Sequence, residues 1–304
     1  MSGTLQYVPR ALSTADSVVH LEYHPHQLAA VPGSDCTRFV CISDTHVQTF
    51  DIPDGDVLLH SGDLTNLGLL KEFEKVMEWI YQLPHKTKIL IAGNHDLTLH
   101  EDWYQEEYHR WHRTAGKQER AKIVELLTGP RAREAGVVYL QDSSYTFRTK
   151  PEGRLWSVYG SPWSPWFHNW AFNYNREYGE ALLSKFPATD ILLTHGPPAR
   201  ILDRTQSLDF AGCADLRNHL PRLRPRLHVF GHIHESRGAH VHAWGPEDTN
   251  TKDTGKDGDG TQRLHETVFV NASNSPAGKG TWRVGQRVPA GGPGFQPVVV
   301  DLRD

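Results

Sequence analysis

Five short polar motifs along the chain concentrate side chains that bind divalent metal ions. They read Asp44-Thr45-His46, Gly62-Asp63, Gly93-Asn94-His95-Asp96, Thr194-His195-Gly196 and Gly231-His232-Ile233-His234. Carboxylates, an amide oxygen and neutral imidazoles suit Mn, Fe or Zn, and no thiolate stands among them. The seven candidate ligands are Asp44, His46, Asp63, Asn94, His195, His232 and His234. They exceed what one closed zinc site takes, but they suit two ions that share a carboxylate, for which Asp63 is the natural candidate.

A short apolar run precedes each of these motifs. The runs cover residues 39–42, 57–59, 89–92, 191–193 and 227–230. Most are rich in β-branched residues, and they predict strands that are buried on both faces. Because ligands of open α/β sheets gather beyond the carboxyl ends of strands, we expect the five strand ends to converge on one site. Gly62, Gly93 and Gly231 would let the backbone pass close to the metals.

Each motif by itself has a simpler structural interpretation. Asp-x-His and Gly-Asp commonly mark turns or strand ends, Asn94 suits a left-handed turn, and a single histidine such as His195 is usually a satisfied polar side chain. Only the ordered combination after five strand-like runs favours a metal site. His60 and His228 lie inside such runs and are expected to support the ligands or fill the core. We expect the other histidines to be surface residues: His20, His24, His26, His85, His100, His109, His112, His219, His240, His242 and His265.

The ordered set resembles the calcineurin-like metallophosphoesterase superfamily. Its pattern runs Asp-x-His, Gly-Asp, Gly-Asn-His-Asp/Glu, His and Gly-His-x-His, and every part is present between about Arg38 and Asn271. Three longer stretches, at 160–163, 194–198 and 224–235, are similar to the small eukaryotic metallophosphoesterase-domain-containing (brain-type) phosphodiesterases. The resemblance implies an α/β fold, a metallophosphoesterase-type α-β-β-α sandwich of two mixed sheets flanked by helices.

The resemblance also implies roles for the motif residues. One metal would be held by Asp44, His46, Asp63 and His234, and the other by Asp63, Asn94, His195 and His232. Two divalent ions about 3.5 to 4 Å apart can hold a bridging hydroxide for in-line attack on phosphorus. His95 is left to donate a proton to the leaving group, and Asp96 would orient it or support the ligands. Manganese is the expected metal, with iron, zinc or magnesium as alternatives.

Several functions fit these motifs. The resemblance favours a phosphodiesterase for small phosphodiesters or nucleotides, including cyclic nucleotides. A protein Ser/Thr phosphatase is disfavoured because Gly62-Asp63 continues as Leu64-Thr65-Asn66, without the Asp-Arg-Gly extension of such enzymes. A non-catalytic metal-binding scaffold of the same fold is disfavoured by the intact ligand set and by His95. A nuclease is disfavoured because the chain has no broad basic face.

Composition limits the classes of partner and the cellular setting. The net charge of −4 offers no electrostatic footprint for extended nucleic acid. Three cysteines without paired spacing, and the lack of an apolar signal or spanning segment, favour a cytoplasmic protein that does not enter a membrane. We expect an irregular N-terminal extension over 1–36 and a single domain over 37–304, with a polar loop insertion at about 245–262. The sequence does not predict the oligomeric state.

The spacing of apolar residues predicts further elements around the site. Helices are expected over 67–82, with Thr65 as N-cap, and over 117–127 and 177–185. Strands are expected over 137–140, 145–148, 155–159, 265–271 and 296–302. The segment 161–173 packs three tryptophans and two phenylalanines outside any periodic element. It is either a loop pinned by its aromatic residues or a wall of the substrate pocket that stacks on a nucleobase.

Overall fold

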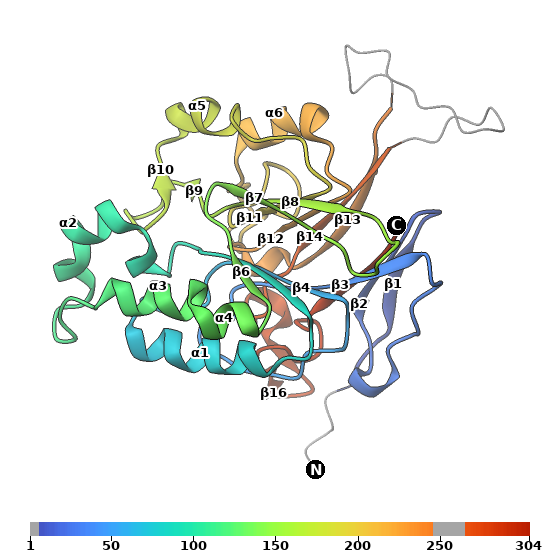
Figure 1. Cartoon of the computed structure of the whole chain (residues 1–304), viewed down its shortest axis with the longest axis horizontal. Coiled ribbons are helices and arrows are strands. Elements are labelled where there is room, and N and C mark those ends of the chain that lie inside the picture. Colours follow the sequence, from blue (N-terminus) through green and yellow to red (C-terminus); the bar gives the residue numbers. More distant parts are fainter. Residues whose placement is uncertain (1–5, 246–264) are drawn as a thin grey trace.

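Two large mixed sheets form the centre of the molecule in this computed structural model, which describes residues 6–245 and 265–304 (Figure 1). The first sheet has seven strands in the order β1-β2-β17-β3-β4-β5-β6. Their bounds are Arg10–Ser13, Ser17–Glu22, Val298–Arg303, Cys36–Ile42, Val57–Ser61, Thr87–Ile91 and Val137–Tyr139. The strands from β3 to β6 are parallel, whereas β17 runs antiparallel to both β2 and β3. The polar insertion expected at about 245–262 lies almost wholly outside the described residues.

The second sheet has six strands in the order β13-β14-β12-β11-β8-β7. Their bounds are Gly238–Ala243, Glu266–Asn271, Leu227–Phe230, Ile191–Thr194, Trp156–Ser161 and Ser143–Phe147. The four inner strands are parallel, and β13 and β7 run antiparallel at the two edges. Two small sheets, each of two short strands, are also present in the described residues: β9 (Ser164–Pro165) pairs with β10 (Asn173–Tyr174), and β15 (Trp282–Arg283) pairs with β16 (Gln286–Arg287).

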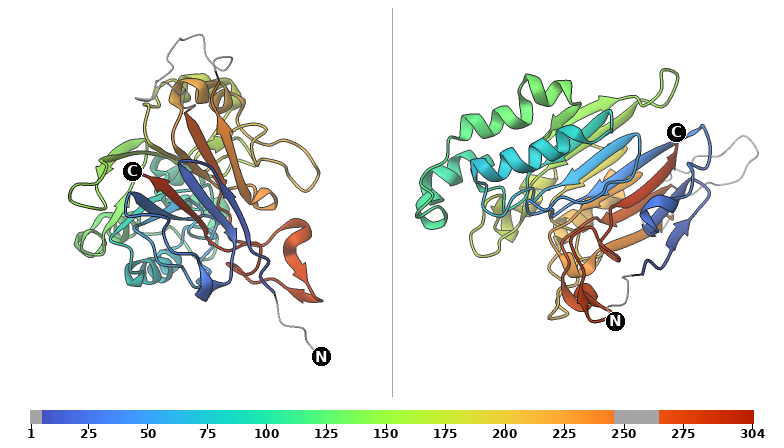
Figure 2. Two further views of the ribbon diagram at one scale, coloured as in Figure 1. Left: turned by 90° about the vertical axis from the view of Figure 1, so that its right-hand side faces the viewer. Right: turned by 90° about the horizontal axis from the view of Figure 1, so that it is seen from below.

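The main core lies between the two sheets, because alternate residues of each strand point inward. Leu59 and Ile91 of the first sheet join Val158, Leu193 and Val229 of the second in one buried cluster. In each strand, the residues that alternate with these point to the outer face of the sheet and pack against helices. The layers are therefore helix, sheet, sheet and helix (Figures 1 and 2), which confirms the predicted α-β-β-α sandwich.

Helices cover the outer face of each sheet. Figure 1 shows α5 (Gly179–Leu183) and α6 (Ala214–Leu223) on one side, and α1 (Leu70–Gln82), α3 (Arg120–Thr128) and α4 (Pro130–Glu134) on the other. The remaining helix, α2 (Glu101–Trp111), lies beside α3 at one end of the sandwich. Among the described residues, no helix has both the length and the apolar character needed to cross a bilayer.

The start of α1 differs from the prediction, although its buried face does not. Phe73, Val76, Met77 and Ile80 are buried at helical spacing, as expected. The helix begins at Leu70, and the Glu72 carboxylate accepts a hydrogen bond from the Leu69 N–H at 3.0 Å. The prediction of Thr65 as N-cap was wrong, because Leu69 is the N-cap; the Thr65 hydroxyl accepts the Gly68 N–H at 3.0 Å before the helix begins, and it donates to Asp96 at 2.8 Å.

The N-terminal segment also differs from the prediction. The description of residues 1–36 as irregular was wrong for β1 and β2, which belong to the first sheet. In β2, Val19 and Leu21 are buried in the main core, and His20 pairs with Val299 of β17. This pairing joins opposite ends of the chain, so local patterning gave no sign of it. The boundary of the single domain stays a prediction.

Candidate metal centre

The carboxyl ends of β3, β4, β5, β11 and β12 meet at one edge of the sandwich and carry the five motifs. Three groups of side chains have ligand atoms within 4.8 Å of one another. They are Asp44 with His46 and His234, Asp63 with His195 and His232, and His46 with Asp63 and His95. Asn94 joins the second group, because its Oδ1 lies 2.9 Å from Nε2 of His195. The structure therefore brings all seven predicted ligands together.

Asp63 lies between the two groups. Its Oδ2 is 3.3 Å from Nε2 of His195 and 3.9 Å from Nε2 of His46. Its Oδ1 accepts the backbone N–H of His95 at 2.8 Å. In the other group, Oδ1 of Asp44 is 3.1 Å from Nε2 of His234. A carboxylate that faces imidazoles of both groups is placed to be shared by two cations.

Backbone carbonyls fix which nitrogen of two imidazoles faces the site. Nδ1 of His195 is 2.9 Å from the Ser61 carbonyl, and Nδ1 of His46 is 3.1 Å from the Thr65 carbonyl. A carbonyl oxygen can only accept, so each Nδ1 carries a proton and each Nε2 is the nitrogen that can bind a cation once any proton on it is displaced. This is the arrangement that metal-binding histidines use, and it fits the residues to divalent cations.

The backbone at the ligands is held in a rarely occupied conformation. Asp44, His46, Asp63 and His232 all have positive φ angles, of 53°, 47°, 54° and 68°. Left-handed conformations cost non-glycine residues about 1 kcal/mol or more each, and they persist where the surrounding structure enforces them. Their concentration at one point marks this edge of the sandwich as a built site.

We expect Gly231→Ala to disrupt the site. A Cβ atom at residue 231 would lie 2.1 Å from Oδ2 of Asp44 and 2.1 Å from Oγ of Ser43, so the carboxylate must move. Overpacking of this kind costs about 1–3 kcal/mol. Thermal unfolding and metal analysis should show lower stability and poor metal retention. Gly238→Ala is the matched control, since its Cβ would make only ordinary contacts, with Leu202 at 3.5 Å and the Ser236 carbonyl at 3.8 Å. Equal metal retention in the two variants would contradict the close packing at Asp44.

Comparison with known proteins gives the family. Residues 37–236 match the description Calcineurin-like phosphoesterase. The chain belongs to this family. Metallophosphoesterase domain-containing protein 1 of Homo sapiens and that of Mus musculus are each 43% identical over 227 residues, covering 70% of this chain and 65% of each relative. A UPF0046 protein of Caenorhabditis elegans is 38% identical over 218 residues, covering 66% of this chain and 70% of that protein.

These similarities confirm the predicted resemblance, including that to metallophosphoesterase-domain-containing proteins. The match spans less than two thirds of the length of the human and mouse relatives, at 65%. The strand-end motifs lie within residues 37–236, so the part of the chain that matches the calcineurin-like phosphoesterase family contains all seven candidate ligands.

Charge in the calcineurin-like centre is arranged to receive cations. Burial acts to raise the pKa of the Asp44 and Asp63 carboxyls, but nearby imidazoles outweigh it and hold both pKa values below their usual range. Burial acts to lower the pKa of His195, but the charge of Asp63 outweighs it and raises that pKa to about 9. The two buried carboxylates thus require positive charge beside them. Protonated imidazoles supply this charge in the metal-free chain, and divalent ions can replace those protons.

Metal binding should therefore release protons and strengthen with pH. With a pKa of about 9, His195 carries a proton at pH 7 that a cation must displace. The affinity should rise as the pH increases from 7 towards 9, because less protonated imidazole remains to be displaced. Titration calorimetry in buffers of different ionisation enthalpy should detect proton release at pH 7 and less of it above pH 9. A binding enthalpy that is independent of the buffer at pH 7 would contradict this linkage.

The side chain of Asp96 binds the backbone of the loops at the centre. Its carboxylate is buried and accepts hydrogen bonds from Gly93 N–H at 2.9 Å and Leu64 N–H at 3.2 Å. It also accepts from the backbone and the hydroxyl of Thr65. Asp96 thus connects the Gly62-Asp63 turn to the Gly93-Asn94 turn, which favours a positioning role. A catalytic role for Asp96 stays a prediction.

His60 and His228 support the ligand loops from within their strands. Nε2 of His60 is 3.0 Å from the Thr45 hydroxyl, and its Nδ1 accepts the Gly62 N–H at 3.3 Å. Nε2 of His228 is 2.9 Å from the Thr194 hydroxyl. Burial lowers the pKa of each to about 3, so both are neutral. Neither belongs to the three groups of candidate ligands described above.

A sixth strand end, that of β14, contributes residues that the sequence interpretation missed. The Ser273 hydroxyl donates to Oδ2 of Asp44 at 2.8 Å, and the Ser275 hydroxyl donates to the Asp44 carbonyl at 2.8 Å. Asn271, which was left unassigned, donates to the Ile233 carbonyl at 2.9 Å and so holds the Gly-His-x-His turn. The available signal was the polar stretch Asn271-Ala272-Ser273-Asn274 directly after an apolar run.

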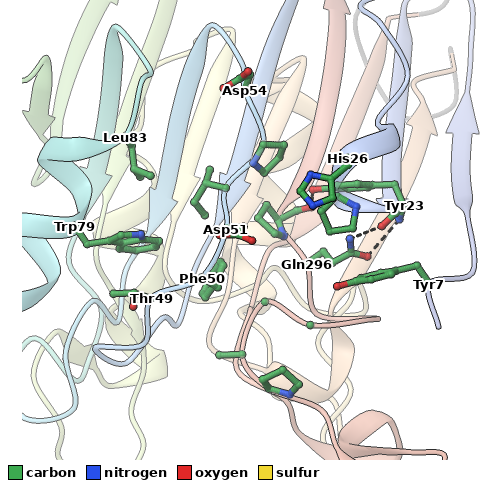
Figure 3. Close-up of a pocket in the computed structure, with 18 residues that line it drawn as sticks. Tyr7, Tyr23, His26, Thr49, Phe50, Asp51, Asp54, Trp79, Leu83 and Gln296 are labelled. Atoms are coloured by element: carbon green, nitrogen blue, oxygen red, sulfur yellow. Dashed lines mark hydrogen bonds between the residues drawn. The ribbon is translucent and has the colours of Figure 1, made fainter. Parts of the chain in front are cut away.

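The described part of the chain also contains a cavity of about 740 Å³ away from the centre (Figure 3). It lies on the outer face of the first sheet, and Figure 3 shows Tyr23, Phe50, Trp79 and Gln296 around it. None of the seven candidate ligands lines this cavity. This cavity is therefore separate from the candidate metal centre.

Proposed function

We propose that this chain is a metal-dependent phosphoester hydrolase, and specifically a dinuclear phosphodiesterase for small phosphodiesters that include cyclic nucleotides. The observation that carries the proposal is the position of Asp63 between two carboxylate–imidazole groups, with His95 beside them. Membership of the calcineurin-like phosphoesterase family supports it. Manganese is the preferred metal, because hard carboxylates and borderline imidazoles are combined without thiolates.

The protein residues divide into a buried wall and an open side. Asp44, Asp63, Asn94 and His195 are buried, whereas His46, His95, His232 and His234 are partly exposed. Bound divalent cations would neutralise phosphoryl oxygens and generate the nucleophile from water at neutral pH. All seven candidate ligands would hold such ions in place, and the partly exposed imidazoles, with His95, would border the space into which a phosphate enters.

His95 is assigned the role of general acid. Its Nδ1 is 2.7 Å from the Asn66 carbonyl, which can only accept, so Nδ1 keeps a proton and Nε2 is the nitrogen free to give one away. The Nε2–H bond breaks as the proton passes to the leaving oxygen, while the P–O bond breaks and leaves its electron pair on that oxygen.

Small substrates are favoured over extended nucleic acid and proteins. The net charge of −4 does not suit a polyanionic chain, and Trp166 and Phe167 expose 53% and 55% of their surface in the loop after β9. Exposed aromatic side chains of this kind can stack on a nucleobase.

Cys36, Cys41 and Cys213 are all unpaired and buried, which supports a reducing, cytoplasmic location.

The substrate class is tested by a panel assayed with added manganese. It contains 2',3'- and 3',5'-cyclic nucleotides, aryl phosphodiesters, phosphomonoesters and a phosphopeptide. We expect hydrolysis of the diesters, loss of hydrolysis with a chelator, and recovery with manganese. Faster hydrolysis of the phosphopeptide than of every diester would favour the protein phosphatase alternative, and turnover of no member would favour the scaffold.

Trp166→Ala and Phe167→Ala test whether the exposed aromatic residues contact substrate. If they stack on a base, KM should rise several-fold for cyclic nucleotides and change little for a methyl aryl phosphodiester, because stacking contributes about 1–3 kcal/mol per base. Kinetics on both substrates should accompany thermal unfolding. An equal loss on both substrates, together with lower stability, would indicate that these residues only hold the loop.

A further inference from the structure

The tryptophan nearest to the proposed general acid is Trp170. It lies in the loop between β9 and β10, within the aromatic segment 161–173. The ring centroids of Trp170 and His95 are 4.1 Å apart, with an angle of 34° between the planes. This is the distance of direct ring contact, so Trp170 covers one face of the His95 imidazole.

The position of Trp170 is fixed by its surroundings. Its ring centroid lies 3.9 Å from that of Trp111 at the end of α2. Oδ1 of Asn173 accepts hydrogen bonds from the backbone N–H groups of Trp170 at 3.1 Å and Phe167 at 3.0 Å, which closes the loop on itself. Arg110 of α2 donates to the His168 carbonyl at 3.0 Å. The loop is thus anchored to the helix at several points around Trp170.

The other contacts of His95 do not fix the orientation of its ring plane, and Trp170 can restrict it. The hydrogen bond from Nδ1 to the Asn66 carbonyl sets the direction of one ring edge, but rotation about that bond still changes where the ring plane points. His46 meets the ring edge-to-face, with centroids 4.7 Å apart and planes at 85°. Trp170 supplies a flat surface against which the ring plane must lie.

We propose that Trp170 is a positioning residue that holds Nε2 of His95 in line with the leaving oxygen. The inference rests on the proposed function of His95. Trp170 is not assigned to base stacking, because its ring already contacts both Trp111 and His95. The aromatic segment thereby has two parts: an anchored tryptophan that serves the proton donor, and the exposed Trp166 and Phe167.

The chemistry predicts a selective effect of removing Trp170. A general acid must lie within hydrogen-bond reach of the leaving oxygen, at about 2.6–3.2 Å, when the P–O bond breaks. A leaving phenol of low pKa departs as the anion without a proton, whereas phenol itself or an alcohol needs one. A misplaced His95 should therefore slow poor leaving groups and spare good ones.

The experiment compares Trp170→Ala with the unaltered chain on methyl aryl phosphodiesters whose leaving groups run from dinitrophenol to phenol. We expect kcat to fall about 10-fold to 100-fold for phenol, part of the 10²–10⁴-fold that general acids contribute, with little change for dinitrophenol. The slope of log kcat against leaving-group pKa becomes steeper. Metal content should not change, and Trp170→Phe should recover most of the rate because it keeps a flat ring.

Three further variants make the result specific. Trp282→Ala removes an exposed tryptophan of β15, 63% accessible, and should leave the slope unchanged. The double variant Trp170→Ala with His95→Ala should lose no more than His95→Ala alone, since both act on one proton transfer. If Trp170→Ala does not fold, Trp111→Ala removes the support behind Trp170 without touching His95 and should steepen the slope in the same direction.

The outcomes separate this inference from the function on which it rests. An equal loss for all leaving groups, or losses that add in the double variant, would overturn the positioning role of Trp170. If His95→Ala itself leaves the slope unchanged, the general-acid assignment fails, and the role of Trp170 fails with it.

Discussion

Asp63→Asn should abolish both metal retention and phosphodiester hydrolysis. Asp63 is the carboxylate that faces imidazoles of both groups, so its loss affects two cations at once. Metal ions contribute several kcal/mol of charge stabilisation, which corresponds to a fall in kcat of about 10³-fold or more. Metal analysis by mass spectrometry and steady-state kinetics with saturating manganese measure the two effects.

The same variant should be less stable without metal at neutral pH. Burial acts to raise the pKa of the Asp63 carboxyl, but nearby imidazoles, His195 first, hold it well below its usual range. A carboxyl whose pKa is lowered in the folded chain stabilises the fold above its ordinary pKa, so removing its charge should lower the unfolding temperature of the metal-free chain at pH 7 and lower it less at acid pH. Asp54→Asn, at an exposed residue, is the control and should keep both metals and activity. Full activity in Asp63→Asn would contradict the shared-carboxylate arrangement.

His95→Ala should retain metal but lose turnover on substrates with poor leaving groups. The seven candidate ligands are unaltered, so metal content should stay at the level of the unaltered chain. The general acid typically contributes about 10²–10⁴-fold, and kcat for an alkyl or phenyl diester should fall by that factor. Kinetics on such a diester and on a dinitrophenyl diester, with metal analysis of the same samples, measure this.

His109→Ala is the control for His95→Ala, because His109 is exposed on α2. It should lose neither metal nor rate. Unaltered turnover of a phenyl diester by His95→Ala would remove the general-acid role. A loss of metal in His95→Ala would instead place His95 among the ligands, which its proximity to His46 and Asp63 allows.

The sequence predicted that the candidate ligands would lie together, because the information for this is local. Each ligand follows an apolar run within a few residues, and strand burial, strand polarity and chain order together place all five ends at one edge. His95 could be separated from the ligands only through the resemblance to a known family. Its hydrogen bond to the Asn66 carbonyl does not make that distinction, because His46 and His195 make the same kind of hydrogen bond.

Contacts between distant parts of the chain could not be predicted in this way. The hydroxyl of Ser273 reaches Asp44 across 229 positions, and β2 pairs with β17 from the opposite end of the sequence. Thr65 looked like a helix cap, but its hydroxyl accepts the Gly68 N–H in a turn before the helix and donates to the buried carboxylate of Asp96. The aromatic segment showed unusual composition, yet only the fold reveals that Trp170 lies on His95 while Trp166 is exposed.

Titration of the metal-stripped chain with manganese, followed by both binding and hydrolysis of an aryl phosphodiester, tests the central claim most directly. Two carboxylate–imidazole groups that share Asp63 predict two bound ions per chain, with hydrolysis rising mainly as the second ion binds. Full hydrolysis at one equivalent of manganese, or hydrolysis that persists in the stripped chain, would contradict a dinuclear centre.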